Sequence, residues 1–202
     1  MTKKLSGKQH IVIPFSYAKE KIRETKNDKI KIVVPGTVSN KRRIYYHVVK
    51  AFQPYLDDID LVFLGKNQLG YRFKGIKTFN DYIPTHQYNS ELATADILLF
   101  PHRRCTNTVN AHIEIYGLTK AFNIHEAIKY RKPFIVPHYS HIPENLREIA
   151  YRYKNIYDLE AFIRKILYDN DFLKKLKEKA FDATKTYTLK HIRKHVYKEL
   201  GI

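Results

Sequence analysis

The sequence predicts an α/β fold, a Rossmann-like three-layer architecture with a parallel sheet, helices on both of its faces, and further helices at the C-terminus. From residue 29 onward, short apolar runs alternate with amphipathic segments, which is the pattern of strand–helix–strand units. The runs are apolar almost without interruption, as expected for strands that are covered on both faces. Several of them end at glycine or proline, which favour turns.

The expected strands are apolar and rich in β-branched residues. The first begins at Lys29 and stops at Pro35-Gly36, and the second stops at Gly65. A run of 12 residues, 102–113, is polar and is expected to be a loop. Strands are predicted at 29–36, 60–65, 77–79, 97–101 and 133–137, after a short strand or extended linker at 9–14.

The expected helices show apolar residues three or four positions apart. Ile44, Val48, Val49 and Phe52 fall on one helical face, and Pro54 marks the end of that helix. The last fifty residues repeat the same spacing and end in a basic helix. Helices are predicted at 44–52, 85–95, 118–131, briefly from 143, and through the last fifty residues, of which 185–200 form the final one, whereas 18–29 is a helix or a loop. One domain is expected over 29–202, after a linker or N-terminal extension over 1–28.

The composition is strongly basic, with 37 Lys and Arg against 20 Asp and Glu and a net charge of +17. Such a charge favours nucleic acid, anionic membrane surfaces or phosphorylated ligands as partners. A solvated basic surface is the alternative, because the lysines are spread along the chain. The single cysteine, Cys105, excludes an internal disulfide. No apolar run reaches the roughly 18 residues of a membrane span, so a cytoplasmic location is expected, with the inner membrane surface as a second location.

Residues 97–137 read as strand, glycine-containing loop, helix and strand. In an open parallel sheet such a loop lies at the carboxyl ends of the strands, where ligands bind. The N-terminus of the helix behind the loop favours anions. This stretch is therefore the first candidate for a binding site.

The order of these elements resembles the C-terminal, donor-binding domain of the retaining GT-B glycosyltransferases, the glycosyl transferases group 1 type. The resemblance covers about residues 30–200. Its six pieces are the glycine-turn strand 32–36 with the basic 41–43, the strand 61–65, the alanine-aspartate strand 95–101, Glu114-Ile115-Tyr116-Gly117, Glu126-Ala127 with 132–137, and the turn 141–144.

The resemblance implies a glycosyltransferase of the hexosyltransferase type. It would bind a nucleoside-diphosphate sugar and transfer the sugar to a glycan or lipid-linked acceptor, as in polysaccharide biosynthesis. A GT-B enzyme also needs an acceptor domain, and 202 residues hold only one of the two halves. An N-terminal acceptor domain or a partner subunit is therefore implied. No cofactor and no metal are expected, because Lys and Arg can neutralise the diphosphate.

Backbone N–H groups at Gly36 and the charges of Lys41, Arg42 and Arg43 suit a diphosphate. Lys41 and Arg42 would also stabilise the leaving diphosphate. The alternative is a set of solvated basic residues before a helix. Thr37 stands where the family has a basic residue.

By resemblance, Glu114 would bind the transferred sugar as the third catalytic residue, and Glu126 would accept hydrogen bonds from the ribose hydroxyls. Eleven residues separate the two glutamates, against seven in the family. An ordinary helix glutamate is the alternative for Glu126. The donor-binding set is completed by Gly36, Thr37, Arg43, Tyr116, Gly117, Leu118, Thr119 and Lys120.

Other chemistry finds less support in the sequence. His102, Cys105 and His112 do not have the spacing of a zinc site, and Asp58-Ile59-Asp60 precedes its strand, so we interpret it as strand-entry charge. The sequence has neither GxGxxG nor a P-loop lysine motif.

The final basic helix could face an anionic membrane or nucleic acid, with a solvated face as the alternative. Two other functions stay open. One is a basic nucleic-acid-binding α/β protein, although no aromatic-basic RNA motif is present and nucleic acid is not the expected partner. The other is a non-catalytic, glycosyltransferase-like scaffold subunit. The basic residues of this helix are Lys185, Lys190, Arg193, Lys194 and Lys198.

Overall fold

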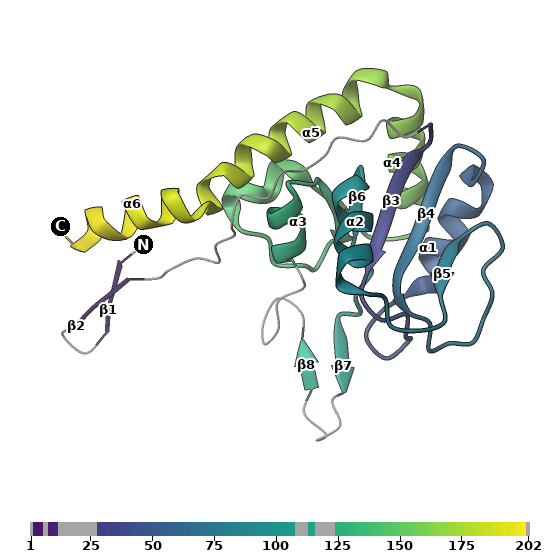
Figure 1. Cartoon of the computed structure of the whole chain (residues 1–202), viewed down its shortest axis with the longest axis horizontal. Helices are drawn as coiled ribbons and strands as arrows, with labels where there is room; N and C mark the ends of the chain where they lie inside the picture. Colours follow the sequence, from purple (N-terminus) through teal and green to yellow (C-terminus); the bar gives the residue numbers. More distant parts are fainter. Residues whose placement is uncertain (1, 6–7, 12–27, 108–112, 116–123, 201–202) are drawn as a thin grey trace.

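A computed structural model of the chain shows a six-stranded, all-parallel sheet between two layers of helices, which confirms the predicted fold class (Figure 1). The structure describes residues 2–5, 8–11, 28–107, 113–115 and 124–200. The sheet has the order β10-β9-β6-β3-β4-β5. Its strands are β3 (Ile30–Pro35), β4 (Ile59–Lys66), β5 (Lys77–Phe79), β6 (Ile97–Leu99), β9 (Phe134–Pro137) and β10 (Ala150–Tyr153).

The chain order of the strands reverses between β3 and β6. From β3 the chain proceeds outward through β4 to β5, then returns to β6 on the other side of β3 and proceeds through β9 to β10. This is the order of a doubly wound sheet. Such a reversal opens a crevice at the carboxyl ends of the two central strands, and ligands of open α/β sheets bind there.

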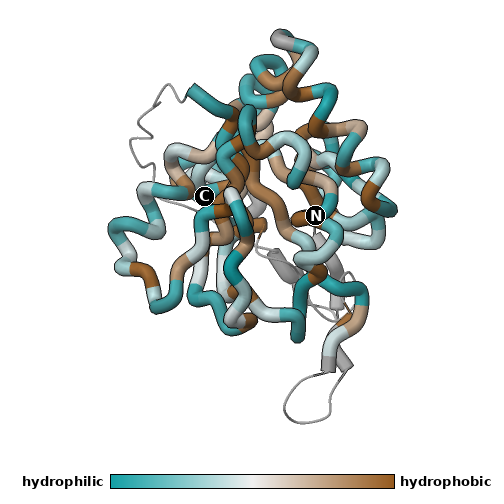
Figure 2. The backbone as a smooth tube through the Cα atoms, turned by 90° about the vertical axis from the view of Figure 1, so that its right-hand side faces the viewer, coloured by the Kyte–Doolittle hydropathy of each residue, from teal (hydrophilic) through white to brown (hydrophobic). Residues whose placement is uncertain are grey.

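Both faces of the sheet are apolar because both are covered. Successive side chains of a strand point to opposite faces, and the two cores divide accordingly. Val33 and Leu98 belong to one core and Ile32 and Ile97 to the other, all fully buried. Figure 2 shows the hydrophobic strands running through the middle of the molecule, with hydrophilic segments outside.

Helices α1 (Tyr45–Phe52) and α4 (Ile156–Tyr168) cover one face of the sheet. The other face is covered by α2 (Thr85–Thr94), α3 (Ile124–Tyr130) and the 3-10 helix η2 (Glu144–Ile149). Helix α5 (Asn170–Thr184) contributes to both cores and lies across the top in Figure 1. Two further 3-10 helices are η1 (Gln53–Tyr55) and η3 (Lys185–Tyr187), and α6 (Leu189–Leu200) extends away from the sheet.

Side-chain caps determine where the C-terminal helices begin. The Asn155 side chain accepts a hydrogen bond from the Asp158 N–H, and the Asp169 side chain accepts one from the Phe172 N–H. Each cap satisfies a backbone donor that the first turn of the helix leaves open. Across the described residues, we find no helix with the length and apolar character that a membrane crossing needs.

Several sequence predictions needed correction. The polar stretch 102–113 was expected to be a loop, yet β7 (Cys105–Asn107) pairs antiparallel with β8 (Ile113–Ile115). Strand β10 was not predicted, because this edge strand is short and half polar. The last helix begins at Leu189 and not at 185, because η3 precedes it.

At the N-terminus, β1 (Thr2–Leu5) and β2 (Lys8–Ile11) form an antiparallel hairpin, where the sequence predicted a strand or extended linker only at 9–14. The predicted helix 118–131 is described as α3 over Ile124–Tyr130. Residues 118–123 of that prediction lie outside the described residues, as do 12–27.

A nearly buried carboxylate links α2 to two strands. The Glu91 side chain, 10% exposed, lies 2.7 Å from Lys31 Nζ of β3 and 2.6 Å from Lys77 Nζ of β5. Burial disfavours the carboxylate, but the hydrogen bonds and charges of the two lysines outweigh it and lower the pKa of Glu91. The ionised pair therefore stabilises the folded chain.

We expect Glu91→Gln to lower the free energy of unfolding by about 2 to 4 kcal/mol, because it leaves two lysines without their counter-charge. The folded pKa lies below the unfolded value of about 4.3, so the contribution is complete above that pH and is lost as the pH falls through the folded pKa. Urea unfolding between neutral and acidic pH measures this. Glu148→Gln, which removes an exposed partner of Lys179, should cost under about 0.5 kcal/mol, and equal losses would contradict the assignment.

Candidate functional site

The turn after β3 lies directly on the backbone of β4. Gly36 has φ +94°, which favours glycine, and its N–H donates to the Leu64 carbonyl at 2.7 Å. A Cβ on Gly65 would lie 2.7 Å from the Thr37 nitrogen and closer still to the Gly36 carbonyl. Both glycines are therefore needed for the turn to approach β4 this closely.

The Arg43 guanidinium lies over this turn. Its Nη1 donates to the Thr37 carbonyl at 3.2 Å and to the Tyr45 hydroxyl at 3.1 Å. A Cβ on Gly36 would collide with Nη2. Arg43 is thus held at the carboxyl end of β3 by the glycine turn and by the first residue of α1.

Backbone hydrogen bonds join the loop after β3 to the loop after β6. The Ile44 N–H donates to the Pro101 carbonyl at 2.8 Å, and the Arg103 N–H donates to the Arg42 carbonyl at 2.9 Å. Between them, Arg43 and His102 form an antiparallel bridge. The two sides of the switch point are therefore one connected structure.

His102 anchors the second loop as a neutral residue. Its Nε2 lies 3.0 Å from the Ser140 hydroxyl, which donates its own proton to the Pro137 carbonyl at 2.6 Å. The Ser140 hydroxyl thus links the imidazole to the end of β9. Burial lowers the pKa of His102 to about 4. A hydrogen bond with the Phe100 backbone opposes this shift and the charge of Arg43 adds to it, so the ring is uncharged at neutral pH.

Glu126 of α3 offers one carboxylate oxygen. The residue is 8% exposed, and its Oε1 accepts a hydrogen bond from the Tyr88 hydroxyl of α2 at 2.5 Å. Its Oε2 is buried and has no hydrogen-bond partner among the described residues. Burial raises the pKa of Glu126 despite the Tyr88 hydrogen bond and the nearby charge of Arg43, among others. The charge of Arg43 also acts on Tyr88, so Glu126 and Tyr88 lie within electrostatic reach of the cation at the turn.

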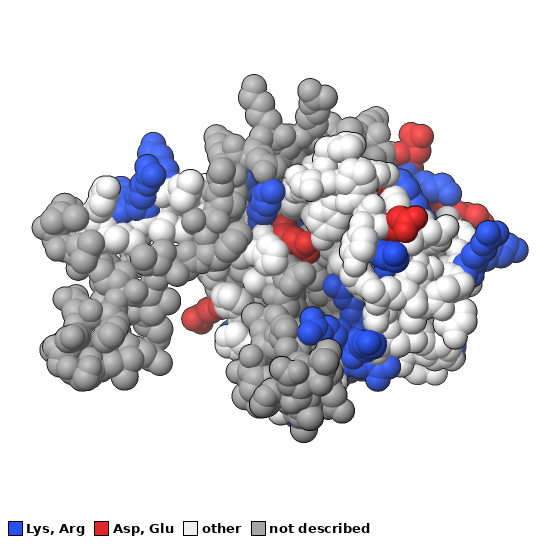
Figure 3. Space-filling model, turned by 60° about the horizontal axis from the view of Figure 1, so that its bottom comes forward, with Lys and Arg blue, Asp and Glu red and all other residues white. Residues whose placement is uncertain are grey.

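The remaining predicted residues divide into two groups. Lys41, Arg42 and Thr37 are exposed on the loop between β3 and α1, and Figure 3 shows Lys and Arg side chains close together on the face at the carboxyl ends of the strands. Glu114 belongs to β8, where its backbone pairs with Thr106. The side chain of Glu114 and all of Tyr116, Gly117, Leu118, Thr119 and Lys120 lie outside the described residues.

The structure brings together residues that the sequence did not assign to the site. Gly65 was identified only as the end of a strand, and Tyr88 lies in the predicted helix 85–95 but was given no role in the site. Tyr45 was not singled out at all. The described residues contain no cluster of three or more His, Cys, Asp or Glu side chains that could hold a metal.

The solved structures that superpose on this chain include glycosyltransferase domains and a domain of a phosphatase. The C-terminal domain of the glycosyl transferase group 1 family protein LpcC from Francisella tularensis superposes with a TM-score of 0.56 at 14% identity, over 83% of this chain and 96% of that one. Anabaena Alr3699/HepE in complex with UDP and glucose gives 0.57 at 10% identity, over 86% of this chain and 48% of that one. The N-terminal domain of Candida albicans trehalose-6-phosphate phosphatase gives 0.57 at 12% identity, over 98% and 51%.

These likenesses show that the chain has the fold of the C-terminal domain of GT-B glycosyltransferases, as the sequence resemblance implied. The chain spans about half the length of the HepE chain. No family model matches the sequence, and no curated protein matches it.

We expect Gly65→Ala to lower the free energy of unfolding by about 1 to 3 kcal/mol or more, because its Cβ meets backbone atoms that cannot move aside. Gly70→Ala is the control for the steric effect, since nothing lies within 4 Å of a Cβ added there; unlike Gly65, Gly70 has a positive φ (+69°). Urea unfolding compares the two variants. The control should lose only about 1 kcal/mol of backbone strain, and a Gly65→Ala variant as stable as the wild type would disprove the close contact.

Proposed function

We propose that this chain is the donor-binding half of a glycosyltransferase, which binds a nucleoside-diphosphate sugar at the β3–β6 switch point. The observation that carries the proposal is the pairing of two groups at one crevice. Arg43 lies over a glycine turn, and its charge reaches the buried carboxylate of Glu126, of which one oxygen has no hydrogen-bond partner among the described residues. A cation suits a diphosphate, and a carboxylate suits the hydroxyls of a ribose.

The diphosphate would lie at the turn between β3 and α1. Arg43 supplies fixed charge there, and Lys41 and Arg42 add exposed charge on the same loop. The N-terminus of α1 also faces an anion favourably, because Ile44 gives no side-chain cap and the first turn has no acidic residue. In the transfer, these charges would stabilise the negative charge that develops on the departing diphosphate.

The ribose would lie at Glu126. An unsatisfied buried acceptor is costly. Hydroxyl donors of a bound ribose would supply the hydrogen bond that Oε2 does not receive from any described residue. Tyr88 occupies Oε1 and thereby orients the carboxylate. Tyr88 is thus a positioning residue in this proposal.

The residues proposed to bind the transferred sugar and the acceptor are assigned by the family resemblance alone. Glu114 would bind the hydroxyls of the transferred sugar, and Tyr116, Gly117, Leu118, Thr119 and Lys120 would contact phosphate or sugar. The acceptor would be a hydroxyl of a glycan or a lipid-linked glycan. An acceptor domain outside residues 29–202 would bind it, consistent with a chain that spans half of HepE.

Thermal unfolding with UDP, GDP, ADP and their sugars tests the proposal. A ligand that binds only the folded chain raises stability by RT ln(1 + [L]/Kd), about 2.7 kcal/mol at a hundred-fold excess over Kd. A shift that depends on the base would support the donor site and identify the nucleotide. The absence of a shift with every nucleotide would overturn it in favour of a scaffold subunit.

We expect Arg43→Gln to weaken the binding of the selected nucleoside diphosphate about 10- to 100-fold, because a charge-assisted hydrogen bond contributes about 1.5 to 3 kcal/mol. Binding of the free nucleoside should change little. Titration calorimetry measures both ligands, with Arg43→Lys as the charge-conserving variant and Lys179→Gln as a remote loss of one charge. If the nucleoside and the diphosphate lose affinity equally, Arg43 does not contact the phosphates.

We expect Glu126→Gln to remove the preference for a ribonucleotide over its 2′-deoxy analogue. Wild-type affinity for the ribonucleotide should also fall as the pH falls, because only the ionised carboxylate accepts both hydroxyl hydrogen bonds. The fall should begin at a higher pH than an ordinary glutamate would give, because the pKa of Glu126 is raised. Competition titrations with both nucleotides across pH measure this, with Glu148→Gln as the control. A discrimination that survives in Glu126→Gln would exclude the ribose role.

A further inference from the structure

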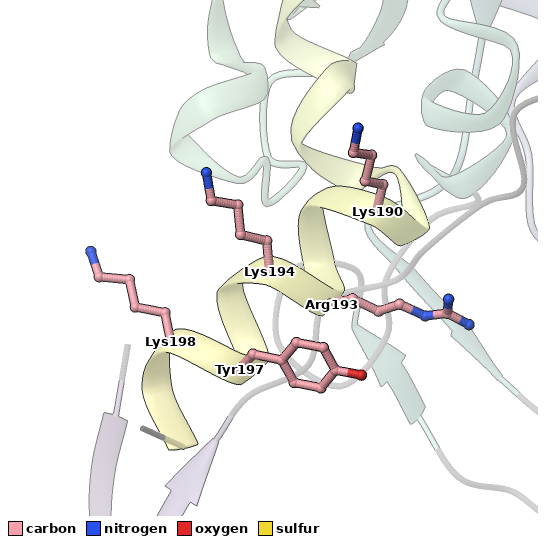
Figure 4. Close-up of a pocket in the computed structure, with 5 residues that line it drawn as sticks. All are labelled: Lys190, Arg193, Lys194, Tyr197 and Lys198. Carbon is pink, nitrogen blue, oxygen red and sulfur yellow. The ribbon is translucent and has the colours of Figure 1, made fainter. Parts of the chain in front are cut away.

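Helix α6 carries a continuous basic stripe that the proposed donor site does not use. Lys190, Lys194 and Lys198 form one row, and Arg193 and Tyr197 form the next (Figure 4). These five side chains are the described residues that line an open hollow of about 530 Å³. From Lys190 to Lys198 the stripe is about 12 Å long, at 1.5 Å per residue. We refer to these five residues as the α6 stripe.

Among the described side chains, which do not include that of Glu199, the cations of the stripe have no counter-charge. Residues 189–198 contain no Asp or Glu, and no hydrogen bond or ion pair joins any of the four cations to another residue in the described part of the chain. The preceding helix differs. On α5 and at the residue after it, four lysines each lie within 4 Å of a carboxylate: Lys175 with Asp171, Lys177 with Asp96, Lys179 with Glu148, and Lys185 with Asp182.

The orientation of α6 keeps this stripe in solvent. Ile192 is 6% exposed and holds the opposite face of the helix against the rest of the chain. Tyr197, next to the cations, is 53% exposed, and Leu189 at the start of the helix is 43% exposed. Like charges on neighbouring turns repel one another, so an unpaired stripe costs stability unless an anionic partner compensates it.

The chemistry of the stripe fits the surface of an anionic membrane better than nucleic acid. Three of its four cations are lysines, whose flexible stems and point charges suit a fluid array of headgroup phosphates, whereas the arginine fork is the usual reader of fixed phosphates. A single exposed tyrosine gives no stacking platform for successive bases. A tyrosine beside lysines is, however, typical of the level of lipid headgroups.

We propose that the α6 stripe binds the headgroups of anionic phospholipids and holds the chain peripherally on a membrane. The interaction is electrostatic, with Tyr197 and Leu189 as shallow apolar contacts. It does not depend on the donor site, because α6 extends away from the sheet (Figure 1). Each lysine near such a surface adds about fivefold to the partition onto the membrane.

The test is sedimentation of the full chain with phosphatidylcholine vesicles, with and without phosphatidylglycerol. We expect binding only to vesicles that contain phosphatidylglycerol, and release at high salt. The variant K190Q/K194Q/K198Q should bind roughly 100-fold more weakly. The control K175Q/K179Q/K185Q removes the same charge from exposed sites on and next to α5 and should bind like the wild type.

Three results would overturn the proposal. The first is an equal loss of vesicle binding in both triple variants. The second is a wild type that does not bind anionic vesicles. The third is a labelled oligonucleotide that binds more tightly than the vesicles and does not bind K190Q/K194Q/K198Q. Lysine and glutamine have similar helix propensities, so both variants should fold, and their thermal unfolding verifies it. Nucleotide binding by K190Q/K194Q/K198Q should equal that of the wild type, whichever result the donor-site experiments give.

Discussion

The backbone contact between the turn at Gly36 and Gly65 is the constraint on which the candidate site depends. Parallel strands end side by side, but ordinary side chains would keep the turn after β3 away from β4. Two glycines remove that obstacle. The turn then directs the chain back over the end of β3, where Arg43 bonds to the Thr37 carbonyl and the adjoining backbone joins the loop after β6. The crevice of the switch point is shaped by this contact.

Burial then determines the charges at the crevice. It keeps His102 neutral at physiological pH, so the ring bonds to the Ser140 hydroxyl and adds no second cation beside Arg43. It also raises the pKa of Glu126, which the charge of Arg43 partly opposes. The result is a fixed positive charge near a buried carboxylate, one oxygen of which accepts no hydrogen bond from the described part of the chain. An anion beside a diol is the ligand chemistry that this arrangement favours.

The sequence predicted the parallel sheet correctly because near-continuous apolar runs such as 30–35 and 59–66 require cover on both faces. It missed β10 and the β7–β8 hairpin, since Ala150–Tyr153 is half polar and Cys105–Asn107 has no apolar alternation. Within the site, the glycine and the basic run at 41–43 were visible as a motif. The motif did not distinguish the three cations, because only tertiary structure places Arg43 over the turn and leaves Lys41 and Arg42 exposed. The contact of Tyr88 with Glu126 joins residues 38 positions apart, which no local pattern encodes.

Hydrogen exchange of the full chain, with and without a saturating nucleoside diphosphate, tests the location of the site most directly. If the switch point binds the nucleotide, the amides of 36–44, 101–103 and 124–126 should exchange more slowly, and those of 189–198 in α6 should not change. The contrary result is a bound nucleotide that leaves 36–44 unprotected, or that protects α6 instead. Such a result would separate the fold from the function that we assign to it.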